Sequence, residues 1–293
     1  MDELTLKPLF MWAGGKNKML KHYKPLMPSP LTSSVESYCE PFFGGGAVFI
    51  YVMNTYAPKY ALINDINPDI VRIYESVKSG LADFTGRLNE LESTYIPMSK
   101  EDRKKYYYEV RHSHAYDYET WSPAYEAATL YFLMKTGFNG IFQINQNTNG
   151  RYGTPSGLLN QKDKVYDRDV LQWWHDALQR TEIRCGDWKD AVSDCPKDTF
   201  FFFDPPYRES FADYGNGFSD DQLIELISFC DKQTYVMLSN RDDEDWFAKQ
   251  EHTLESVNFD IFYTAGRRKK TKEGFDAKKA REILLYRMNN DND

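Results

Sequence analysis

The chain has 293 residues, 41% of them hydrophobic, which is enough to bury one large core or two modest ones. No apolar run reaches about 18 residues, and the N-terminus lacks the order of basic and then apolar residues that marks a signal peptide. The composition therefore excludes a disordered or membrane-spanning chain and predicts a cytoplasmic protein that makes no membrane contact. The four cysteines are widely spaced without a C-x-x-C pair, so we expect neither a disulfide framework nor a metal site.

The formal net charge is −8, yet positive charge is concentrated in two segments. Residues 266–281 hold eight basic residues against two acidic ones. In an otherwise acidic chain, such a segment favours contact with the phosphates of nucleic acid. The second segment, residues 100–114, interleaves basic residues with tyrosines, and a solvated helix face explains it as well as phosphate contact does.

Strand and helix patterns alternate at the start of the chain and then give way to helices. The pattern predicts strands at 33–41 and 60–65, followed by helices at 47–56 and 68–80 respectively. From about 81 to 138 it predicts only helices, including one over 122–137. Residues 138–157 are rich in Asn, Gly, Thr and Gln, a composition typical of a β-hairpin or a long loop.

The alternation resumes in the second half of the chain. We expect helices at 168–180, 219–232 and 242–250, and strands at 182–187, 199–204, 234–240, 257–266 and 281–288. The polar, helical middle is therefore predicted to be an insertion into one α/β domain. We assign residues 1–80 and 160–293 to that domain and residues 81–159 to the insertion.

Three glycines follow the first predicted strand, in the segment EPFFGGG at 40–46. Glycine there lets the backbone approach a ligand closely. Asp65 lies 21 residues after Gly44, at the end of the next strand, where nucleotide-binding folds place an acid on the ribose hydroxyls. The glycines do not form the G-x-G-x-x-G pattern that binds a pyrophosphate, so a ligand without phosphates fits better, and S-adenosylmethionine is such a ligand.

The segment TFFFFDPPY, residues 199–207, ends an apolar strand on a carboxylate. Four consecutive phenylalanines predict a central strand of a largely parallel sheet, and ligands bind at the carboxyl ends of such strands. Pro205 and Pro206 have a fixed φ and no N–H, so they form a rigid turn whose carbonyl oxygens can accept. Asp204 and the Pro205 carbonyl can each accept one N–H of an exocyclic amino group, while the Tyr207 ring stacks on a planar heterocycle.

Several segments, taken in order, resemble the Dam-type DNA adenine methyltransferases of the α group, and the resemblance covers essentially the whole chain. They are FMWAGGKNKML at 10–20, EPFFGGG at 40–46, LYFLMKTGFNGIFQIN at 130–145, DPPY at 204–207, YVMLSN at 235–240, TAGRRKK at 264–270 and AREILLYRM at 280–288. The resemblance implies a Rossmann-like methyltransferase sheet with helices on both faces and an inserted, mostly helical DNA-recognition domain with a β-hairpin. It also implies transfer of a methyl group from S-adenosylmethionine to the N6 amino group of an adenine flipped out of double-stranded DNA.

The resemblance further implies roles for single residues. Lys16 would pair with the carboxylate of S-adenosylmethionine, Asp65 would hold its ribose, and Asp187 with Trp188 would bracket its adenine. The full cofactor-binding set is Trp12, Lys16, Phe43, Gly44, Asp65, Asp187, Trp188 and Asp204, and the catalytic set is Asp204, Pro205, Pro206 and Tyr207.

DNA recognition departs from the family pattern at one position. In the resembling family a hairpin after F-N-G enters the duplex, and an arginine in it reads a guanine. Gln143 stands at that place here, and glutamine prefers adenine. We therefore hypothesise a site other than GATC, or relaxed specificity. Asn139 and Asn145 either contact phosphates or cap turns, and the loop candidates for phosphate contact are Arg267, Arg268, Lys269 and Lys270.

Two alternative functions stay open. Asp204 and the Pro205 carbonyl suit any exocyclic amine, so methylation of the cytosine N4 group is one. The other is a DNA-binding regulator with a vestigial cofactor site, which the intact DPPY segment, Lys16 and Asp65 disfavour. A dinucleotide oxidoreductase is disfavoured by the glycine pattern. We expect a bacterial or phage protein of the restriction-modification type, either monomeric or dimeric on DNA.

Overall fold

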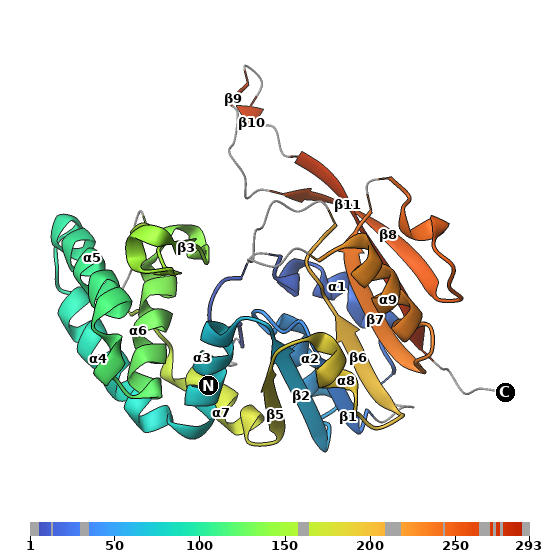
Figure 1. Ribbon diagram of the computed structural model, residues 1–293, viewed down its shortest axis with the longest axis horizontal. Coiled ribbons are helices and arrows are strands. Elements are labelled where there is room, and N and C mark those ends of the chain that lie inside the picture. The colour runs from blue at the N-terminus through green and yellow to red at the C-terminus, as the bar shows by residue number, and fades with distance from the viewer. Residues whose placement is uncertain are drawn as a thin grey trace.

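The computed structural model describes residues 6–12, 14–29, 35–157, 164–208, 218–242, 244–263, 270–271, 274–275 and 278–288. For the described residues from 262 to 279 it gives the backbone alone. A seven-stranded sheet crosses the centre of the molecule and helices flank it (Figure 1). This arrangement confirms the predicted α/β class with a mostly parallel sheet. None of the helices in these ranges has the length and apolar character needed to cross a membrane.

The central sheet is formed by β1 (Ser37–Glu40), β2 (Tyr60–Asp65), β5 (Thr181–Cys185), β6 (Thr199–Phe203), β7 (Tyr235–Arg241), β8 (Glu255–Tyr263) and β11 (Lys278–Met288). The strands lie in the order β5-β2-β1-β6-β7-β11-β8. The first five are parallel, whereas β11 is antiparallel to both β7 and β8. The chain winds outward from β1 to β5 and then returns to β6, so the switch point where ligands bind such sheets lies between β1 and β6.

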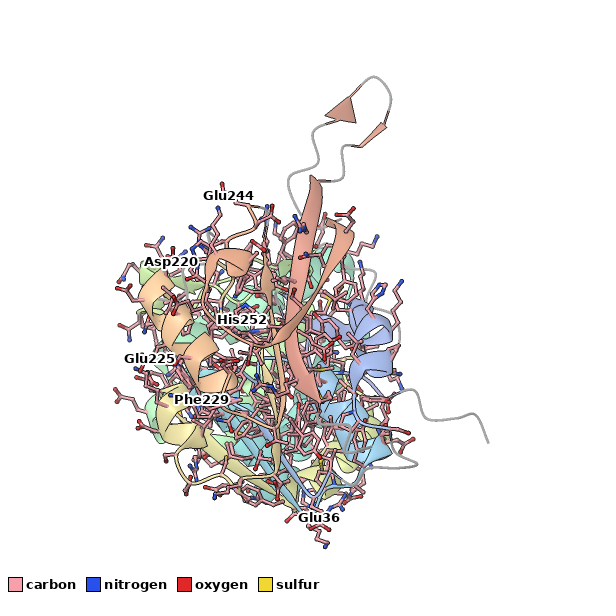
Figure 2. The ribbon with its side chains drawn as sticks, turned by 90° about the vertical axis from the view of Figure 1, so that its right-hand side faces the viewer. Glu36, Asp220, Glu225, Phe229, Glu244 and His252 are labelled. Carbon is pink, nitrogen blue, oxygen red and sulfur yellow. The ribbon has the colours of Figure 1, made fainter. Side chains whose placement is uncertain are left out.

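Helices cover both faces of the sheet. One face packs against α1 (Leu20–Tyr23), α2 (Ala47–Thr55), α3 (Pro68–Ser79) and α7 (Arg168–Leu178), with the short 3-10 helices η1 (Lys16–Lys18) and η2 (Lys24–Leu26) beside them. The other face packs against α8 (Trp188–Val192) and α9 (Asp220–Cys230). Figure 2 shows Asp220 and Glu225 along the outer side of α9.

The four phenylalanines of β6 are explained by these two layers. Phe200 and Phe202 belong to the buried cluster on the α2 face, and Phe201 and Phe203 belong to the cluster on the α9 face. None of the four is more than 2% exposed. Because side chains alternate between the faces of a sheet, a strand that is covered on both faces is apolar at every position.

The middle of the chain is helical, as predicted. It consists of α4 (Leu81–Tyr95), α5 (Lys100–Tyr116) and α6 (Pro123–Thr136), with η3 (Tyr118–Thr120) before α6. Ser99 and Ser122 cap α5 and α6, because each hydroxyl accepts a backbone N–H three residues on. Helix α6 packs against α3, so this region adjoins the helices that cover the sheet (Figure 1).

The predicted hairpin forms just after α6. β3 (Ile144–Asn145) pairs antiparallel with β4 (Arg151–Tyr152). The 3-10 helix η4 (Phe138–Gly140) precedes the hairpin, and η5 (Gln146–Thr148) lies in its turn.

The helix predicted over 242–250 is wrong. In the described part of that segment the helical element is η6 (Phe247–Lys249) alone. The Asp242 carboxylate accepts the N–H of Trp246 at 2.6 Å, and Asp245 has a φ of 53°, which an α-helix cannot contain. Farther along the chain, between β8 and β11 in the sequence, β9 (Lys270–Thr271) pairs antiparallel with β10 (Gly274–Phe275).

Candidate active site

A cavity of about 1830 Å³ opens at the carboxyl ends of β1, β2 and β6. A pocket for one small ligand usually has about 300–1,000 Å³, so this cavity has room for a cofactor and a base together. Both motifs from the sequence, residues 40–46 and 204–207, line it. So do the other residues assigned to the cofactor, which are Trp12, Lys16, Asp65, Asp187 and Trp188.

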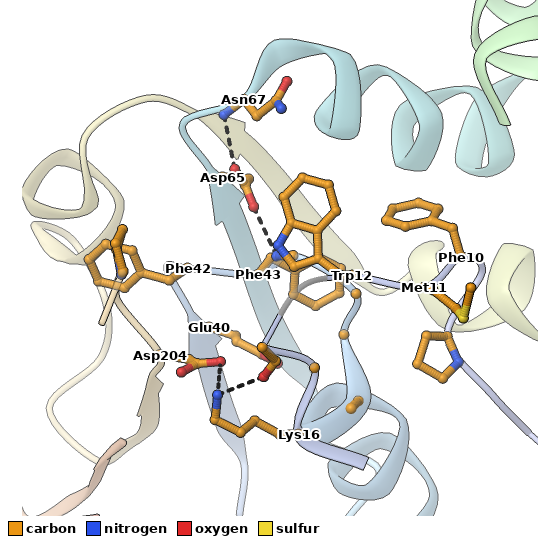
Figure 3. A pocket seen from close by; sticks show the side chains of 18 of the residues that line it. Phe10, Met11, Trp12, Lys16, Glu40, Phe42, Phe43, Asp65, Asn67 and Asp204 are labelled. Atoms are coloured by element: carbon orange, nitrogen blue, oxygen red, sulfur yellow. Dashed lines mark hydrogen bonds and ion pairs between the residues drawn. The ribbon is translucent and has the colours of Figure 1, made fainter. Parts of the chain in front are cut away.

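Asp204 stands at the carboxyl end of β6, and both of its carboxylate oxygens are bonded. Ser239 Oγ donates to Oδ1 at 2.8 Å, and Lys16 Nζ lies 2.6 Å from Oδ2 (Figure 3). Burial raises the pKa of Asp204 above its ordinary value, although Lys16 and Ser239 lower it. The two donors hold the carboxylate in one orientation.

Lys16 contacts the DPPY segment. Its ammonium lies 4.7 Å from the centre of the Tyr207 ring, in addition to its contact with Asp204, and it donates to the carbonyl oxygen of Gly14 at 2.8 Å. The residue is only 3% exposed. The resemblance assigns Lys16 to the carboxylate of the cofactor, whereas in the structure it contacts an acid and an aromatic ring of the catalytic set.

Glu282 in β11 is a site residue that the sequence analysis missed. It lines the cavity, is 3% exposed, and its Oε1 accepts the hydroxyl of Tyr207 at 3.0 Å. The available signal was an acid within the apolar segment AREILLYRM, where Glu282 shares one face of the strand with the buried residues Ala280 and Leu284. An acid at such a position costs stability and therefore points to a function.

Glu40, the last residue of β1, is a second buried acid beside the cavity. It accepts the hydroxyl of Tyr38 at 2.7 Å. Burial raises the pKa of Glu40 well above its ordinary value, and the nearby Asp204 raises it further. Burial therefore favours the neutral form of Glu40, which is one of several acidic residues, Asp204 and Glu282 among them, that line this cavity.

The glycine turn is held by the acid that follows it. Gly44 has a φ of 49°, and its N–H donates to Asp65 Oδ2 at 2.8 Å, while Asn67 N donates to Oδ1 at 2.9 Å (Figure 3). A Cβ atom at Gly44 would lie 2.5 Å from the Trp12 ring, so only glycine fits. Burial raises the pKa of Asp65 above its ordinary value.

The aromatic residues assigned to the cofactor differ in their surroundings. Phe43 is 3% exposed and packs edge-on against Phe49 and Tyr74, so it belongs to the core as well as to the cavity wall. Trp12 is half-buried and lies 5.7 Å, between ring centres, from Phe142, which precedes the hairpin. Trp12 therefore joins the glycine turn to the hairpin region.

Asp187 and Trp188 occupy the first turn of α8. Asp187 is exposed, and its carboxylate caps the helix by accepting the N–H of Lys189 at 2.9 Å. Trp188 is 5% exposed and packs edge-on against Phe203 and Phe229. Its indole N–H is buried and has no hydrogen-bond partner among the described residues, which leaves a donor available to a ligand.

Of the three residues in and near the hairpin that are assigned to DNA, Asn139 lies on the rim of the cavity. Asn139 is exposed, with a φ of 53°, and Gln143 is exposed as well. Asn145 accepts the N–H of Asn147 at 2.9 Å and so caps the turn, the second of the two roles considered for it. Ile141 and Ile144 add exposed apolar surface to the same rim.

The structure describes the two basic segments to different extents. Arg267, Arg268 and Lys269 lie outside the described residues, and for Lys270 only the backbone, in β9, is described. In α5, Arg111 donates to the carbonyl oxygens of Gly153 and Thr154, and Arg103 donates to those of Tyr95 and Ile96. These two arginines therefore make contacts within the protein.

An ion-pair network anchors the hairpin to the helices. Arg151 in β4 pairs with Glu126 in α6, whose Oε1 also lies 3.1 Å from Arg72 in α3, and Arg72 pairs with Asp69 at 3.2 Å. Burial, together with Arg151 and Arg72, lowers the pKa of the adjacent His114 to about 3, so its ring is neutral at neutral pH. The network connects β4 to α3, the helix that follows Asp65.

The comparisons with known proteins agree with this geometry. The family model of the D12 class N6 adenine-specific DNA methyltransferases matches residues 12–283. The chain is 32% identical over 257 residues to the type II methyltransferase M.MjaIII of Methanocaldococcus jannaschii, which covers 84% of this chain and 88% of that protein. It is 30% identical over 253 residues to the type II methyltransferase M1.LlaDCHI of Lactococcus lactis subsp. cremoris, 82% of each chain. It is 26% identical over 275 residues to the DNA adenine methylase of Escherichia coli K12, 89% of this chain and 91% of that one.

These matches confirm the predicted enzyme and the base that it modifies, and neither cytosine N4 methylation nor a vestigial site is favoured. Family membership implies S-adenosylmethionine as the methyl donor. In the described part of the chain, no group of three His, Cys, Asp or Glu side chains is arranged to hold a metal ion. The chain belongs to the D12 class of N6 adenine-specific DNA methyltransferases.

Proposed function

We propose that this methyltransferase holds the N6 amino group of its target adenine between the Asp204 carboxylate and the Pro205 carbonyl oxygen, with the Tyr207 ring stacked on the base. The main support is the position of Asp204, which faces the cavity at the carboxyl end of β6 and is oriented by Ser239 and Lys16. Pro206 makes the turn between acid and ring rigid.

These contacts would make the adenine amino nitrogen a better nucleophile. The lone pair of the adenine amino nitrogen is delocalised into the ring, and two acceptors for its N–H groups favour a pyramidal nitrogen and stabilise the positive charge that builds on it. S-adenosylmethionine supplies a methyl group on a positively charged sulfur. Methyl transfer would form a bond from N6 to the methyl carbon as the carbon–sulfur bond breaks, the neutral thioether would leave, and Asp204 is the adjacent base for the proton that N6 loses.

We assign the rest of the cavity to S-adenosylmethionine. Asp65 already accepts two backbone N–H groups and keeps further lone pairs for the ribose hydroxyls. Trp12, Phe43 and Gly44 line the cofactor. The buried indole N–H of Trp188 supports its assignment, with Asp187, to the adenine end.

Two roles can be assigned to Lys16. The Lys16 ammonium has three N–H donors, of which Asp204 and the Gly14 carbonyl oxygen take two, so a third can serve the carboxylate of the cofactor. Its 2.6 Å contact with Asp204 supports a second role, in which Lys16 keeps the acceptor ionised and oriented.

We propose that residues 81–159 form the DNA-recognition part and that residues 1–80 and 160–293 form the catalytic domain. One support is the exposed apolar side chains of Ile141 and Ile144, which lie on the rim of the same cavity as Asp204. The other is Gln143, which is exposed between them in the sequence. The substrate is then a duplex from which the target adenine is flipped, because a stacked base cannot reach a cavity of this kind. The enzyme would act where that DNA lies, in the cytoplasm of a bacterium or of a phage-infected host, as a monomer or as a dimer on DNA.

The direct test is incubation with S-adenosylmethionine and DNA of mixed sequence, followed by sequencing of modified bases. We expect N6-methyladenine in one sequence context. Asp204→Ala should abolish transfer and retain most of the DNA affinity. The matched control is Asp198→Ala, which removes an exposed acid just before β6. A fully active Asp204→Ala variant would refute the proposed site.

A further inference from the structure

We propose that Glu282 is a positioning residue for methyl transfer, because it fixes the Tyr207 ring against which the target base stacks. The inference rests on the proposed function of Tyr207. Glu282 itself lies on β11, far along the chain from the DPPY segment, and belongs to none of the residues assigned to the site from the sequence.

The geometry ties the tyrosine to the sheet. Glu282 lies between Arg241 of β7 and Phe259 of β8 in the strand register, so its backbone is held on both sides. Its Oε1 accepts the Tyr207 hydroxyl at 3.0 Å, and its Oε2 accepts the hydroxyl of the fully buried Tyr23 at 3.5 Å. The carboxylate therefore connects a cavity residue to a strand that is paired on both sides and to the buried core.

The fold alone does not call for an acid at this position. The neighbours of Glu282 on the same face of β11, Ala280 and Leu284, are apolar and at most 3% exposed. A buried charge costs stability, and an apolar residue of similar volume is often neutral or stabilising at such a site. We therefore infer that the function of Glu282 is to orient Tyr207.

A tyrosine side chain is fixed at both ends only if its hydroxyl is bonded. The Tyr207 backbone follows the rigid Pro205 and Pro206, and Glu282 holds the far end of the ring. The Lys16 ammonium, 4.7 Å from the ring centre, marks the face that is turned to the catalytic acid. Loss of the Glu282 contact removes one restraint on rotation about the two side-chain bonds of Tyr207, so a base that stacks on the ring is positioned less well.

The test combines four variants with a control: Tyr207→Phe, Glu282→Leu, Glu282→Gln, the double variant Tyr207→Phe/Glu282→Leu, and Tyr286→Phe. Tyr286 lies on the same strand and donates to Glu255 at 2.8 Å in an exposed pair, so Tyr286→Phe removes an equivalent bond far from the cavity. Each protein is assayed for kcat, KM for DNA and thermal stability. Extrusion of the base is followed by the fluorescence of 2-aminopurine at the mapped target position.

We expect Tyr207→Phe and Glu282→Leu each to lower kcat/KM about tenfold, as for the loss of one hydrogen bond to a charged group, with a smaller fluorescence change. The double variant should lose no more than either single variant, because both remove the same contact. Glu282→Gln, whose amide oxygen still accepts, should stay within about threefold of the wild type. Glu282→Leu should melt lower than the wild type, because the buried Tyr23 hydroxyl loses an acceptor, and Glu282→Gln and Tyr286→Phe should melt with the wild type. The activity of Tyr286→Phe should be unchanged.

Wild-type activity of Glu282→Leu or of Tyr207→Phe would overturn the inference, and so would additive losses in the double variant. A Glu282→Leu protein that fails to fold leaves Tyr207→Phe and Glu282→Gln to decide. Full activity of a Tyr207→Ala variant would separately refute the stacking role proposed for Tyr207. Loss of activity in Tyr207→Ala with an unaffected Glu282→Leu would refute only the role of Glu282.

Discussion

The ammonium nitrogen of Lys16 lies 2.6 Å from Oδ2 of Asp204 and 4.7 Å from the centre of the Tyr207 ring. A side chain from the N-terminal segment thus contacts two of the three groups proposed to hold the target base. Burial raises the pKa of Asp204, and the positive charge of Lys16 opposes that rise. Lys16 therefore extends the pH range over which Asp204 is an ionised acceptor.

Replacing Lys16 by methionine should shift the pH dependence of the enzyme. Without the ammonium the pKa of Asp204 rises further, and the carboxylate form needed to accept the amino group is lost at higher pH. The acidic limb of kcat/KM, which reports groups of the unbound enzyme, should therefore move upward in pH. Lys16→Met should lose more activity at pH about 6 than at pH about 8.

The matched control is Lys59→Met. Lys59 pairs with Glu36 at 2.9 Å in an exposed position, where an ion pair contributes little. Its pH profile should equal that of the wild type. An unshifted acidic limb in Lys16→Met would show that Lys16 does not act on Asp204, and would favour the carboxylate of S-adenosylmethionine as its partner.

Glu40 predicts a pH dependence of stability. Its pKa is raised in the folded state, mainly by burial, so its contribution is fully present below the ordinary value of 4.5 and is lost as the pH rises through the folded value. Glu40→Gln keeps an acceptor for the Tyr38 hydroxyl and removes the ionisation. Its melting temperature should match that of the wild type at the acidic end of the range and exceed it increasingly as the pH rises. A constant difference across this range would contradict the assignment.

The meeting of the two motifs at one edge of the sheet could be predicted from the sequence, because it depends on strand direction alone. Parallel strands align their carboxyl ends, so Glu40 to Gly46, Asp65 and Asp204 had to meet at one edge once each was assigned to a strand end. The apolar character of every position in β6 also predicted cover on both faces.

Other parts of the site depend on contacts that no local pattern contains. The partner of Lys16 could not be identified, because a lysine beside a cofactor and a lysine beside an acid have the same local sequence. Glu282 was missed because β11 reaches the cavity by antiparallel pairing late in the chain. Residues 242–250 failed as a helix because the Asp242 side chain bonds the local backbone instead.

Glu126 should contribute more to the free energy of unfolding than an exposed ion-paired residue does. It accepts from Arg151 and Arg72, and its side chain is 12% exposed, so its removal leaves two arginines of a shielded network without their common partner. Glu126→Gln should lower the free energy of unfolding by about 1–3 kcal/mol, between the values for exposed and buried pairs. Because Arg151 belongs to β4, DNA affinity should fall as well.

Glu90→Gln provides the comparison for Glu126, because Glu90 pairs with Arg87 at 3.1 Å but is 64% exposed. Its unfolding free energy should change by less than about 0.5 kcal/mol, with unchanged DNA binding. Equal effects of the two substitutions in chemical denaturation would mean that the network does not anchor the hairpin.

Gln143 predicts how the recognition sequence can be changed. Its side chain is exposed just before β3, at the place that the resemblance assigns to a guanine-reading arginine. Gln143→Arg should shift the preferred base at one position of the methylated sequence toward guanine, since a bidentate contact discriminates by about 1–3 kcal/mol. Sequencing of modified bases from a methylation-free host that expresses each protein measures the shift directly.

An added positive charge could by itself tighten DNA binding without reading a base. Gln146→Arg separates the two effects, because Gln146 is exposed in the same hairpin but does not stand at the reading position. That variant should bind DNA more tightly with stronger salt dependence and keep the wild-type sequence preference. If Gln146→Arg changed the preference in the same way, or if Gln143→Arg left it unaltered, Gln143 would not be a base-reading residue. The specificity would then have to lie elsewhere along the hairpin or in the shape of the duplex.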